Sequence, residues 1–304
     1  MSLLPLPPAT RQLGLSGIAI SPIAWGMWRL SDAGLSGAET AALVHAALDS
    51  GITLFDTADI YGFNGTNGFG EAEALLGEVL AAEPGLRRRM VLATKGGIRP
   101  PLPYDQSATY LRDAIDKSLV RLKTDSVDLW QIHRPDILAH PHETARALDD
   151  AVASGKVRAL GVSNFGQPQI AALNHFLGKK LVTTQTEISA FRIDCLENGE
   201  LDQVMQLGLT PLAWSPLGGG RIAGADSDCD KAIVAELDRV AADKGTSRAV
   251  AAYSWLLAHP AGIVPIIGSQ QAVRIAEGAL ALEVQWTRTD WYSVLVAARG
   301  APLP

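Results

Sequence analysis

The sequence predicts an α/β fold, a (β/α)8 TIM barrel, from three observations. Eight short apolar runs recur along the 304 residues, and each ends in a polar or glycine-rich tip. Stretches with the apolar spacing of amphipathic helices lie between them. Strands that alternate with helices indicate βαβ units and parallel pairing, and eight such units fit a closed barrel better than an open sheet.

A doubly wound open sheet is the alternative fold. It predicts a G-x-G-x-x-G turn directly after an early strand, where the turn would bind the phosphates of a nucleotide. The nearest approach is GFGEAE at 68–73, which lacks the third glycine and follows a loop. The barrel is therefore the favoured fold.

The barrel strands are expected in the eight apolar runs. These runs are 18–28, 52–59, 90–97, 127–136, 157–165, 182–189, 209–220 and 262–269. A short N-terminal β-hairpin over 10–19 is expected to close the base of the barrel, and an extra helix is expected at the C-terminus. We expect residues 1–304 to form a single barrel domain.

Several helices have recognisable starts and stops. Ser36 and Glu39 resemble a capping box, and Gly51 follows this helix as a C′ glycine would. Similar patterns cover Gly70 to Leu80, Ser107 to Leu122, and Pro141 to Ser154 before Gly155.

Composition limits the partners and the compartment. The 26 basic and 32 acidic residues give a net charge of −6, and no basic stretch could follow a nucleic-acid backbone. Two cysteines exclude a disulfide framework and a multi-cysteine zinc site. The start MSLLPLPPAT lacks a positively charged signal-peptide region, and no uninterrupted apolar run is long enough to cross a bilayer. We expect a cytoplasmic protein that acts on a small molecule, with its oligomeric state left open.

Polar side chains gather at four predicted strand tips, namely Asp56, Lys95, His133 and the pair Ser163-Asn164. The carboxyl ends of barrel strands surround one shared pocket. Alternation along the strands supports an inward direction, since His133 lies on the same side as Gln131 and opposite Trp130.

A tyrosine follows the first of these tips, in the segment DTADIYG that contains Asp56 and Tyr61. A phenol with a pKa near 10 is a poor proton donor or acceptor at neutral pH. A nearby ammonium such as that of Lys95 favours the phenolate, and a carboxylate can hold that ammonium in place. Together with His133, these residues suggest proton transfer to or from an oxygen, as in carbonyl reduction.

Each residue also has a structural interpretation. Asp56 and Lys95 could form a purely structural buried pair, and His133 could be a core histidine. Asp59 and Asp136 could form a metal site with His133, but the same pocket would place Lys95 beside the cation. We therefore expect no metal.

The ordered motifs DTADIYG, LATKGG, DLWQIHRPD, GVSNF, WSPLGGG and PIIGS resemble the aldo-keto reductase family. The resemblance runs from about Ile18 to Leu282, and it implies a barrel oxidoreductase that uses a nicotinamide cofactor. It implies that Tyr61 is the general acid in reduction and the general base in oxidation. Lys95, paired with Asp56, would lower the pKa of Tyr61.

The resemblance also implies substrate contacts. His133 would hydrogen-bond the carbonyl of the substrate and orient it, beside Tyr61. Trp28, at the tip of the first strand, is expected to line the substrate pocket. Loop 62–70, which follows Tyr61, is glycine-rich and lies near the expected mouth.

The cofactor would bind in an extended form across the mouth of the barrel. Ser163, Asn164 and Gln185 match positions that hold the carboxamide, and Trp214 matches the residue that stacks on the nicotinamide ring. The expected cofactor set is Gly26, Met27, Asp56, Ser163, Asn164, Gln185, Trp214, Ser215, Leu217, Gly219, Ser269, Arg274 and Glu277.

Two departures from the family pattern affect the choice of cofactor. Relatives often have a lysine where this chain has Gly268 and an asparagine where it has Gly278. Ser269 and Arg274 still match the positions that contact the 2′-phosphate, and an arginine can bind a phosphate in a bidentate manner. NADP(H) is therefore expected, with NAD(H) possible.

Two other functions remain open. The enzyme could be an NAD-linked dehydrogenase that oxidises a sugar or an alcohol. Alternatively, the chain could be a nucleotide-binding sensor or subunit with little turnover. Turnover of an aldehyde distinguishes the two enzymes, the reductase and the dehydrogenase, from the sensor.

Overall fold

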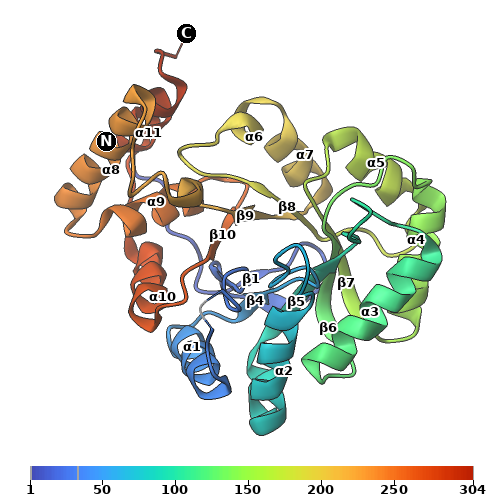
Figure 1. Ribbon diagram of the computed structural model, residues 1–304. Coiled ribbons are helices and arrows are strands. Elements are labelled where there is room, and N and C mark those ends of the chain that lie inside the picture. The colour runs from blue at the N-terminus through green and yellow to red at the C-terminus, as the bar shows by residue number, and fades with distance from the viewer. Residues whose placement is uncertain (1, 33, 304) are drawn as a thin grey trace.

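Eight parallel strands close into a barrel in the order β10-β3-β4-β5-β6-β7-β8-β9 (Figure 1). The computed structural model describes residues 2–32 and 34–303. Every barrel strand lies within one of the predicted runs, so the fold class is confirmed. The strands are β3 (Ala24–Gly26), β4 (Leu54–Asp56), β5 (Val91–Gly96), β6 (Val127–Ile132), β7 (Val157–Ser163), β8 (Thr183–Glu187), β9 (Thr210–Trp214) and β10 (Val264–Ile267).

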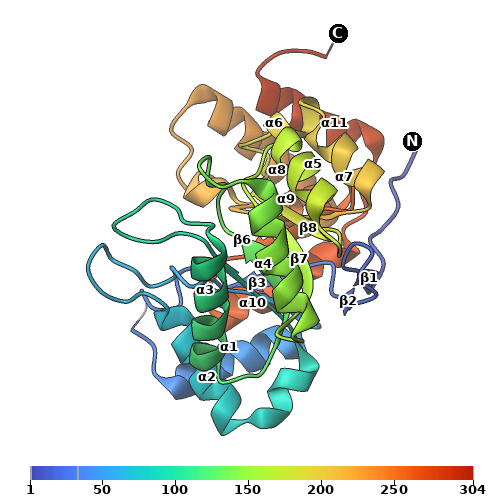
Figure 2. The ribbon, with the colours of Figure 1, turned by 90° about the vertical axis from the view of Figure 1, so that its right-hand side faces the viewer.

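Helices surround this barrel (Figures 1 and 2). They are α1 (Gly37–Asp49), α2 (Glu71–Ala82), α3 (Ala108–Leu122), α4 (Pro141–Ala153), α5 (Gln167–Phe176), α6 (Asp194–Glu197), α7 (Glu200–Leu207), α8 (Asp228–Lys244), α9 (Arg248–Leu257), α10 (Ala272–Ala279) and α11 (Arg288–Arg299). Three short 3-10 segments, 84–89, 218–220 and 280–283, complete the helical elements. The predicted capping box of α1 is present, because the Ser36 side chain accepts from Glu39 N–H and the Glu39 carboxylate accepts from Ser36 N–H.

The N-terminal hairpin pairs β1 (Arg11–Gln12) with β2 (Ala19–Ile20) in an antiparallel arrangement. The side chains of Leu13, Ile18 and Ile20 pack against the apolar residues inside the barrel, so the hairpin closes one end. The predicted run 18–28 is thus two elements, β2 and β3. Pro22, which has no N–H for a ladder bond, separates them, and the Ser21 hydroxyl accepts from Thr53 N–H at 2.8 Å.

Two apolar layers lie on the two sides of the sheet. The inner layer contains Leu54, Ala93 and Leu129, whereas Phe55 and Trp130 pack between the strands and the helices. This alternation confirms the predicted direction of β6, with Leu129 inward and Trp130 outward. The polar residues that share the inward side therefore lie inside the barrel, above the inner apolar layer.

The C-terminal part of the chain departs most from a simple alternation of strand and helix. Both α8 and α9 lie between β9 and β10, and α11 follows α10 as the predicted extra helix. Helices α8 and α11 pack together, and Leu4 N–H donates to Trp286 O at 2.8 Å in the approach to α11. Within the described ranges 2–32 and 34–303, no helix has the length and apolar character needed to cross a membrane.

Candidate active site

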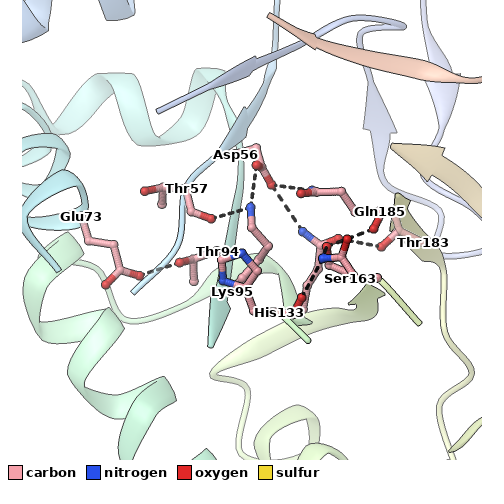
Figure 3. A network of polar contacts seen from close by, with 11 residues as sticks. Asp56, Thr57, Glu73, Thr94, Lys95, His133, Ser163, Thr183 and Gln185 are labelled. Atoms are coloured by element: carbon pink, nitrogen blue, oxygen red, sulfur yellow. Dashed lines mark hydrogen bonds and ion pairs between the residues drawn. The ribbon is translucent and has the colours of Figure 1, made fainter. Parts of the chain in front are cut away.

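The ion pair between Lys95 and Asp56 lies at the centre of the site (Figure 3). Lys95 extends from β5 and is fully buried, and its Nζ lies 2.6 Å from Asp56 Oδ2 and 2.9 Å from Thr57 O. Burial lowers the pKa of Lys95, but the charge of Asp56 and the contacts with Asp56 and Tyr61 outweigh it, and the net shift is upward. The lysine is therefore held in its charged form.

Two amides hold the other oxygen of the Asp56 carboxylate. Gln185 Nε2 donates to Oδ1 at 2.9 Å, and Gln131 Nε2 donates to it at 3.4 Å. Thr183 Oγ1 in turn donates to Gln131 Oε1 at 3.3 Å. The sequence analysis placed Gln131 on the inward face but gave neither Gln131 nor Thr183 a role. The signal that could have found Gln131 is a polar side chain at an inward strand position, where it needs a partner.

Tyr61 lies between Lys95 and His133. Lys95 Nζ is 4.9 Å from the centroid of the Tyr61 ring, and the centroids of the Tyr61 and His133 rings are 5.8 Å apart. Burial raises the pKa of Tyr61, while Lys95 lowers it. The expected downward effect of Lys95 is present, but in this structure burial outweighs it. The geometry therefore brings the four expected catalytic residues together.

His133 follows β6 directly, and its backbone N–H donates to Gly96 O at 2.8 Å. Burial lowers the pKa of His133 well below its usual value, and the nearby charges of Lys95 and Arg134 add to this effect. The imidazole is therefore neutral at physiological pH. Its Nδ1 is buried without a hydrogen-bond partner among the residues that the structure describes. A neutral imidazole has one N–H, which can donate to a carbonyl oxygen.

Four of the expected cofactor residues form a network next to these groups. Ser163 Oγ donates to Gln185 O at 3.0 Å, and Asn164 Nδ2 donates to His133 O at 3.1 Å. Trp214 Nε1 donates to Asn164 Oδ1 at 3.0 Å, which connects the end of β9 to the end of β7. Asn164 has a left-handed backbone, with φ 59°, an arrangement that asparagine tolerates well.

The segment after β9 presents an open backbone. Ser215 has φ 48°, and Gly219, with φ 65°, has no heavy atom within 4 Å of the position that a Cβ would occupy. Leu217 is half-buried, whereas Gly219 is exposed. An exposed run of small residues lets backbone N–H groups approach an anion closely.

The ends of β10 and β3 are joined by two side chains. Trp25 Nε1 donates to Ser269 O, and Gln270 Nε2 donates to Gly26 O, both at 3.0 Å. Arg274 is exposed and Glu277 half-buried on α10, and the charges of both act on the Tyr253 hydroxyl, whose pKa is raised by burial. The two hydrogen bonds place Ser269 and Gln270 beside the tip of β3.

Two residues at the tip of β3 differ in exposure. The Met27 side chain is fully buried in the core, so any contact that Met27 makes in the pocket would come from its main chain. Trp28 is 59% exposed, which fits the rim of the pocket.

The two unusual glycines have different surroundings. A Cβ at Gly278 would overlap Ile267 Cδ1, so an asparagine does not fit there without movement of that side chain. A Cβ at Gly268 would meet open space.

These residues fit an extended dinucleotide. They lie at the ends of β7, β8, β9, β10 and β3, which are consecutive neighbours around the barrel. A ligand that follows this arc would meet amide groups at one end, the open backbone after β9 in the middle and Arg274 at the other. Within the described part of the chain, no group of three or more His, Cys, Asp or Glu side chains could hold a metal ion.

Comparison with known proteins identifies the family of the chain. The model of the Aldo/keto reductase family matches residues 22–294. The chain belongs to this family. A 6-dehydroglucose reductase from Novosphingobium aromaticivorans is 75% identical over 304 residues, with 100% of both chains covered. A 6-dehydroglucose reductase from Agrobacterium fabrum is 40% identical, with 93% of this chain and 96% of that protein covered.

A solved structure supports the fold of this aldo-keto reductase. The thermostable aldo-keto reductase Tm1743, in complex with the inhibitor epalrestat, matches with a TM-score of 0.80 at 24% identity. The match covers 95% of this chain and 99% of the other. The protein is thus an oxidoreductase that acts on carbonyl or alcohol groups, from a family that typically uses a nicotinamide cofactor.

Proposed function

We propose that this aldo-keto reductase reduces 6-dehydroglucose, a hexose with an aldehyde at C6, to the corresponding primary alcohol with NADPH. The observation that carries this proposal is the full-length identity of 75% to a 6-dehydroglucose reductase. The buried group of Asp56, Tyr61, Lys95 and His133 supports it, because this group can supply a proton to a carbonyl oxygen.

Each of these residues has a defined task in reduction. His133, which is neutral, donates a hydrogen bond to the carbonyl oxygen and orients it. Tyr61 donates the proton to this oxygen, and Lys95 stabilises the phenolate that remains. Asp56 keeps Lys95 charged and in place, and is itself held by Gln131 and Gln185. The bound nicotinamide supplies the hydride.

The cofactor is held by the arc of strand ends. Asn164, Gln185 and Ser163 bind the carboxamide, and Trp214 stacks on the ring. Gly26 and Met27 contact the cofactor through their main chain, and Ser215, Leu217 and Gly219 cover the pyrophosphate. Trp28 lines the substrate side of the mouth.

Arg274 and Ser269 provide the preference for NADPH. Arg274 is exposed on α10, so its guanidinium is accessible to the 2′-phosphate. Glu277, one turn further along α10, contacts the adenine.

The first test is a titration of the purified protein with NADPH and NADH, followed by fluorescence quenching. We expect NADPH to bind at least about tenfold more tightly, which corresponds to about 1.4 kcal/mol. Arg274→Ala should remove this preference and leave the affinity for NADH unchanged. If neither dinucleotide binds, the protein is not a nicotinamide-dependent reductase.

The second test measures the substrate. With NADPH in excess, 6-dehydroglucose should be reduced with a higher kcat/KM than glyceraldehyde or an uncharged aromatic aldehyde. Equal rates on all three aldehydes would contradict the sugar specificity. Tight cofactor binding with no turnover would instead support a nucleotide sensor.

The open space at Gly268 favours one second candidate. Without a cation at this position the 2′-phosphate site is weakened, and an NAD-linked oxidation of a sugar or alcohol by the same residues becomes possible, with Tyr61 as the base. Equal or tighter binding of NADH in the titration would support this candidate.

A further inference from the structure

A second polar cluster lies behind the catalytic groups, on the outer side of β4 and β5, where α2 and α3 cover the barrel. Thr94 Oγ1 donates to Glu73 Oε1 at 2.5 Å, and Arg121 Nε donates to Glu73 Oε2 at 2.7 Å. Figure 3 shows Glu73 and Thr94 on one side of Lys95, and Gln185 and Ser163 on the other. The proposed reaction uses none of the residues in this cluster.

Asp59 belongs to this cluster and is buried, with 1% of its surface exposed. Its backbone N–H donates to Lys95 O at 2.9 Å. A Cβ at Gly96 would lie 2.9 Å from both Asp59 Oδ2 and Trp130 Cζ2, so the carboxyl and the indole pack against the same point of the chain. Neither oxygen of the Asp59 carboxyl has a hydrogen-bond partner among the residues described.

Two further buried polar atoms lie on this side of the sheet. Trp130 Nε1, on the indole that borders Gly96, and Thr57 Oγ1, at the end of β4, also have no partner in the described part of the chain. Buried polar groups without a protein partner are normally satisfied by ordered water. The Trp130 indole and the Asp59 carboxyl border the same point of the chain at Gly96, so one buried water can bond to both.

The charges around Asp59 determine its ionisation. Burial raises the pKa of Asp59 well above its usual value, and Glu73 on α2 raises it further. Arg121 on α3, the nearby backbone N–H of Ile60 and Lys95 on β5 oppose this shift without cancelling it. Tyr110 on α3 also lies near the carboxyl and is neutral, since burial raises its pKa. Burial without an ion-pair partner favours the protonated form of the Asp59 carboxyl, which has one O–H to donate.

We propose that Asp59 is a positioning residue for Tyr61, and that its carboxyl is joined through buried water to the Trp130 indole N–H, which borders the same point of the chain at Gly96. Asp59 lies two residues before Tyr61. The backbone N–H of Tyr61 donates to Ala58 O at 3.2 Å, which fixes the turn between Asp59 and Tyr61. The backbone N–H of Ala72 donates to Tyr61 O, also at 3.2 Å, and this bond attaches the turn to α2. Anchoring the Asp59 side chain fixes the remaining side of this turn.

The neutral form also matters for the ion pair. A charged Asp59 would compete with Asp56 for the ammonium of Lys95, which acts on both carboxyl groups. A neutral Asp59 leaves Asp56 as the partner, so Lys95 stays directed toward Asp56 and Tyr61. The kinetic experiment on Asp59 rests on the proposed function, whereas the infrared and unfolding experiments do not.

The charge of Asp59 is tested without any substrate. The infrared difference between the wild type and Asp59→Asn at pH 7 should show loss of a neutral carboxylic-acid band. The unfolding free energy of the wild type should also fall as pH rises above about 4, the pKa of an unfolded aspartate, because the unfolded chain releases a proton that the folded protein keeps. Asp59→Asn should remove this slope. If the infrared difference instead shows loss of a carboxylate band, Asp59 is charged in the wild type and the proposal is overturned.

The positioning role is tested by kinetics. Asp59→Asn keeps the shape and neutrality of the side chain, so its kcat should stay within about twofold of the wild type. Asp59→Ala should lower kcat by about tenfold or more, because a small misplacement of a catalytic group is costly, with little change in KM. A wild-type kcat in Asp59→Ala, or an equal loss in both variants, would contradict the role.

Asp128→Ala is the matched control. Asp128 is also a buried aspartate, on the neighbouring strand β6, but it pairs with Arg87 at 2.8 Å and with Arg158 at 2.5 Å, away from Tyr61. This control should lose stability and keep kcat.

Two outcomes need a further readout. If Asp59→Ala does not fold, the infrared band and the kinetics of Asp59→Asn decide the proposal. If the wild type reduces no aldehyde, the proposed function fails, and the ultraviolet titration of Tyr61, assigned with Tyr61→Phe, decides the positioning role. Asp59→Asn should leave that titration unchanged and Asp59→Ala should shift it; an unchanged titration in Asp59→Ala overturns the role.

Discussion

Lys95 shows how strongly the residues of the site depend on one another. Its ammonium is fully buried, and Asp56 and the carbonyl of Thr57 are its hydrogen-bond acceptors. Removal of one partner of a buried ion pair typically costs about 3–5 kcal/mol, because it leaves an uncompensated charge. Substitution of Asp56 or Lys95 would therefore change stability and catalysis together. Tyr61, which carries no charge at neutral pH, is a cleaner probe of the reaction.

Tyr61→Phe should lower kcat by about 10²- to 10⁴-fold, the usual contribution of a positioned general acid. The ring and its packing against Lys95 and His133 remain, so cofactor affinity should stay within about twofold. Steady-state kinetics with NADPH and an aldehyde, together with a fluorescence titration, measure both quantities. Loss of cofactor binding would show that Tyr61 supports the pocket rather than the proton transfer.

His133 gives a prediction for pH. Its folded pKa is depressed, so the unfolded chain binds a proton that the folded protein does not, and stability should fall as pH drops below about 6.5, the unfolded value. His133→Gln removes this titration. Urea unfolding between pH 7 and pH 5 should therefore show a smaller loss of stability in the variant. An equal loss in both proteins would mean that other groups account for the acid sensitivity.

The residues at the strand tips were predictable because alternation and position alone identify them. Asp56, Lys95 and His133 are charged or polar at inward positions of runs that are otherwise apolar, and the structure brings them together. The links to Gln131 and Thr183 were not predictable, because they depend on which strands are neighbours in the closed barrel. Asp59 was considered only as a metal ligand, since nothing in the sequence indicates that it lies on the outer side of the sheet.

At the scale of elements, the strands were easier to predict than the connections. Most barrel strands are largely apolar on both faces, so they appear as continuous runs, whereas β8 consists of polar residues. The run 18–28 was wrongly taken as one strand, because Pro22 interrupts it and the Ser21 hydroxyl replaces a backbone partner. Region 189–200, which follows β8, contains the short helix α6 and the start of α7, two elements that the apolar spacing did not indicate.

The contact between α2 and α3 depends on one glycine. A Cβ at Gly77 would overlap Arg121 O at the end of α3, and a backbone atom cannot move aside as a flexible side chain can. Gly77→Ala should therefore destabilise the protein by about 1–3 kcal/mol despite the better helix propensity of alanine.

The matched control is Gly85→Ala in the 3-10 segment 84–89. No heavy atom lies within 4 Å of the position of its Cβ, so the change should be nearly neutral. Urea unfolding measures both variants. Equal stability of the two would show that α3 shifts to admit the methyl group.

At the scale of the whole molecule, the two ends of the barrel have separate tasks. The catalytic residues lie at the carboxyl ends of the strands, and the hairpin β1–β2 packs against the apolar layer at the opposite end. In barrels of this kind the amino-terminal face contributes to stability and the carboxyl-terminal face to function. The closed barrel was predictable because eight apolar runs indicate eight βα units. The insertion of α8 between β9 and α9 was not predictable, because its amphipathic pattern resembles that of any helix that covers the barrel.

Leu13→Ala tests this separation. Leu13 is fully buried under the barrel, so its truncation should cost about 2–5 kcal/mol. The kcat of the folded variant should stay within about twofold of the wild type at a temperature well below its unfolding midpoint. A large drop in kcat would show that the base of the barrel also shapes the mouth.

The burial of Lys95 also determines how the enzyme responds to amine chemistry. Acylating reagents attack an accessible, unprotonated amine, and Lys95 is neither, because Asp56 holds it charged beneath Tyr61. Lysines on the outside, such as Lys117 and Lys231, have more than half of their side chains in solvent. Spontaneous acetylation in a cell, or attachment of the protein to an amine-reactive support, would therefore consume the outer lysines and leave the catalytic one intact.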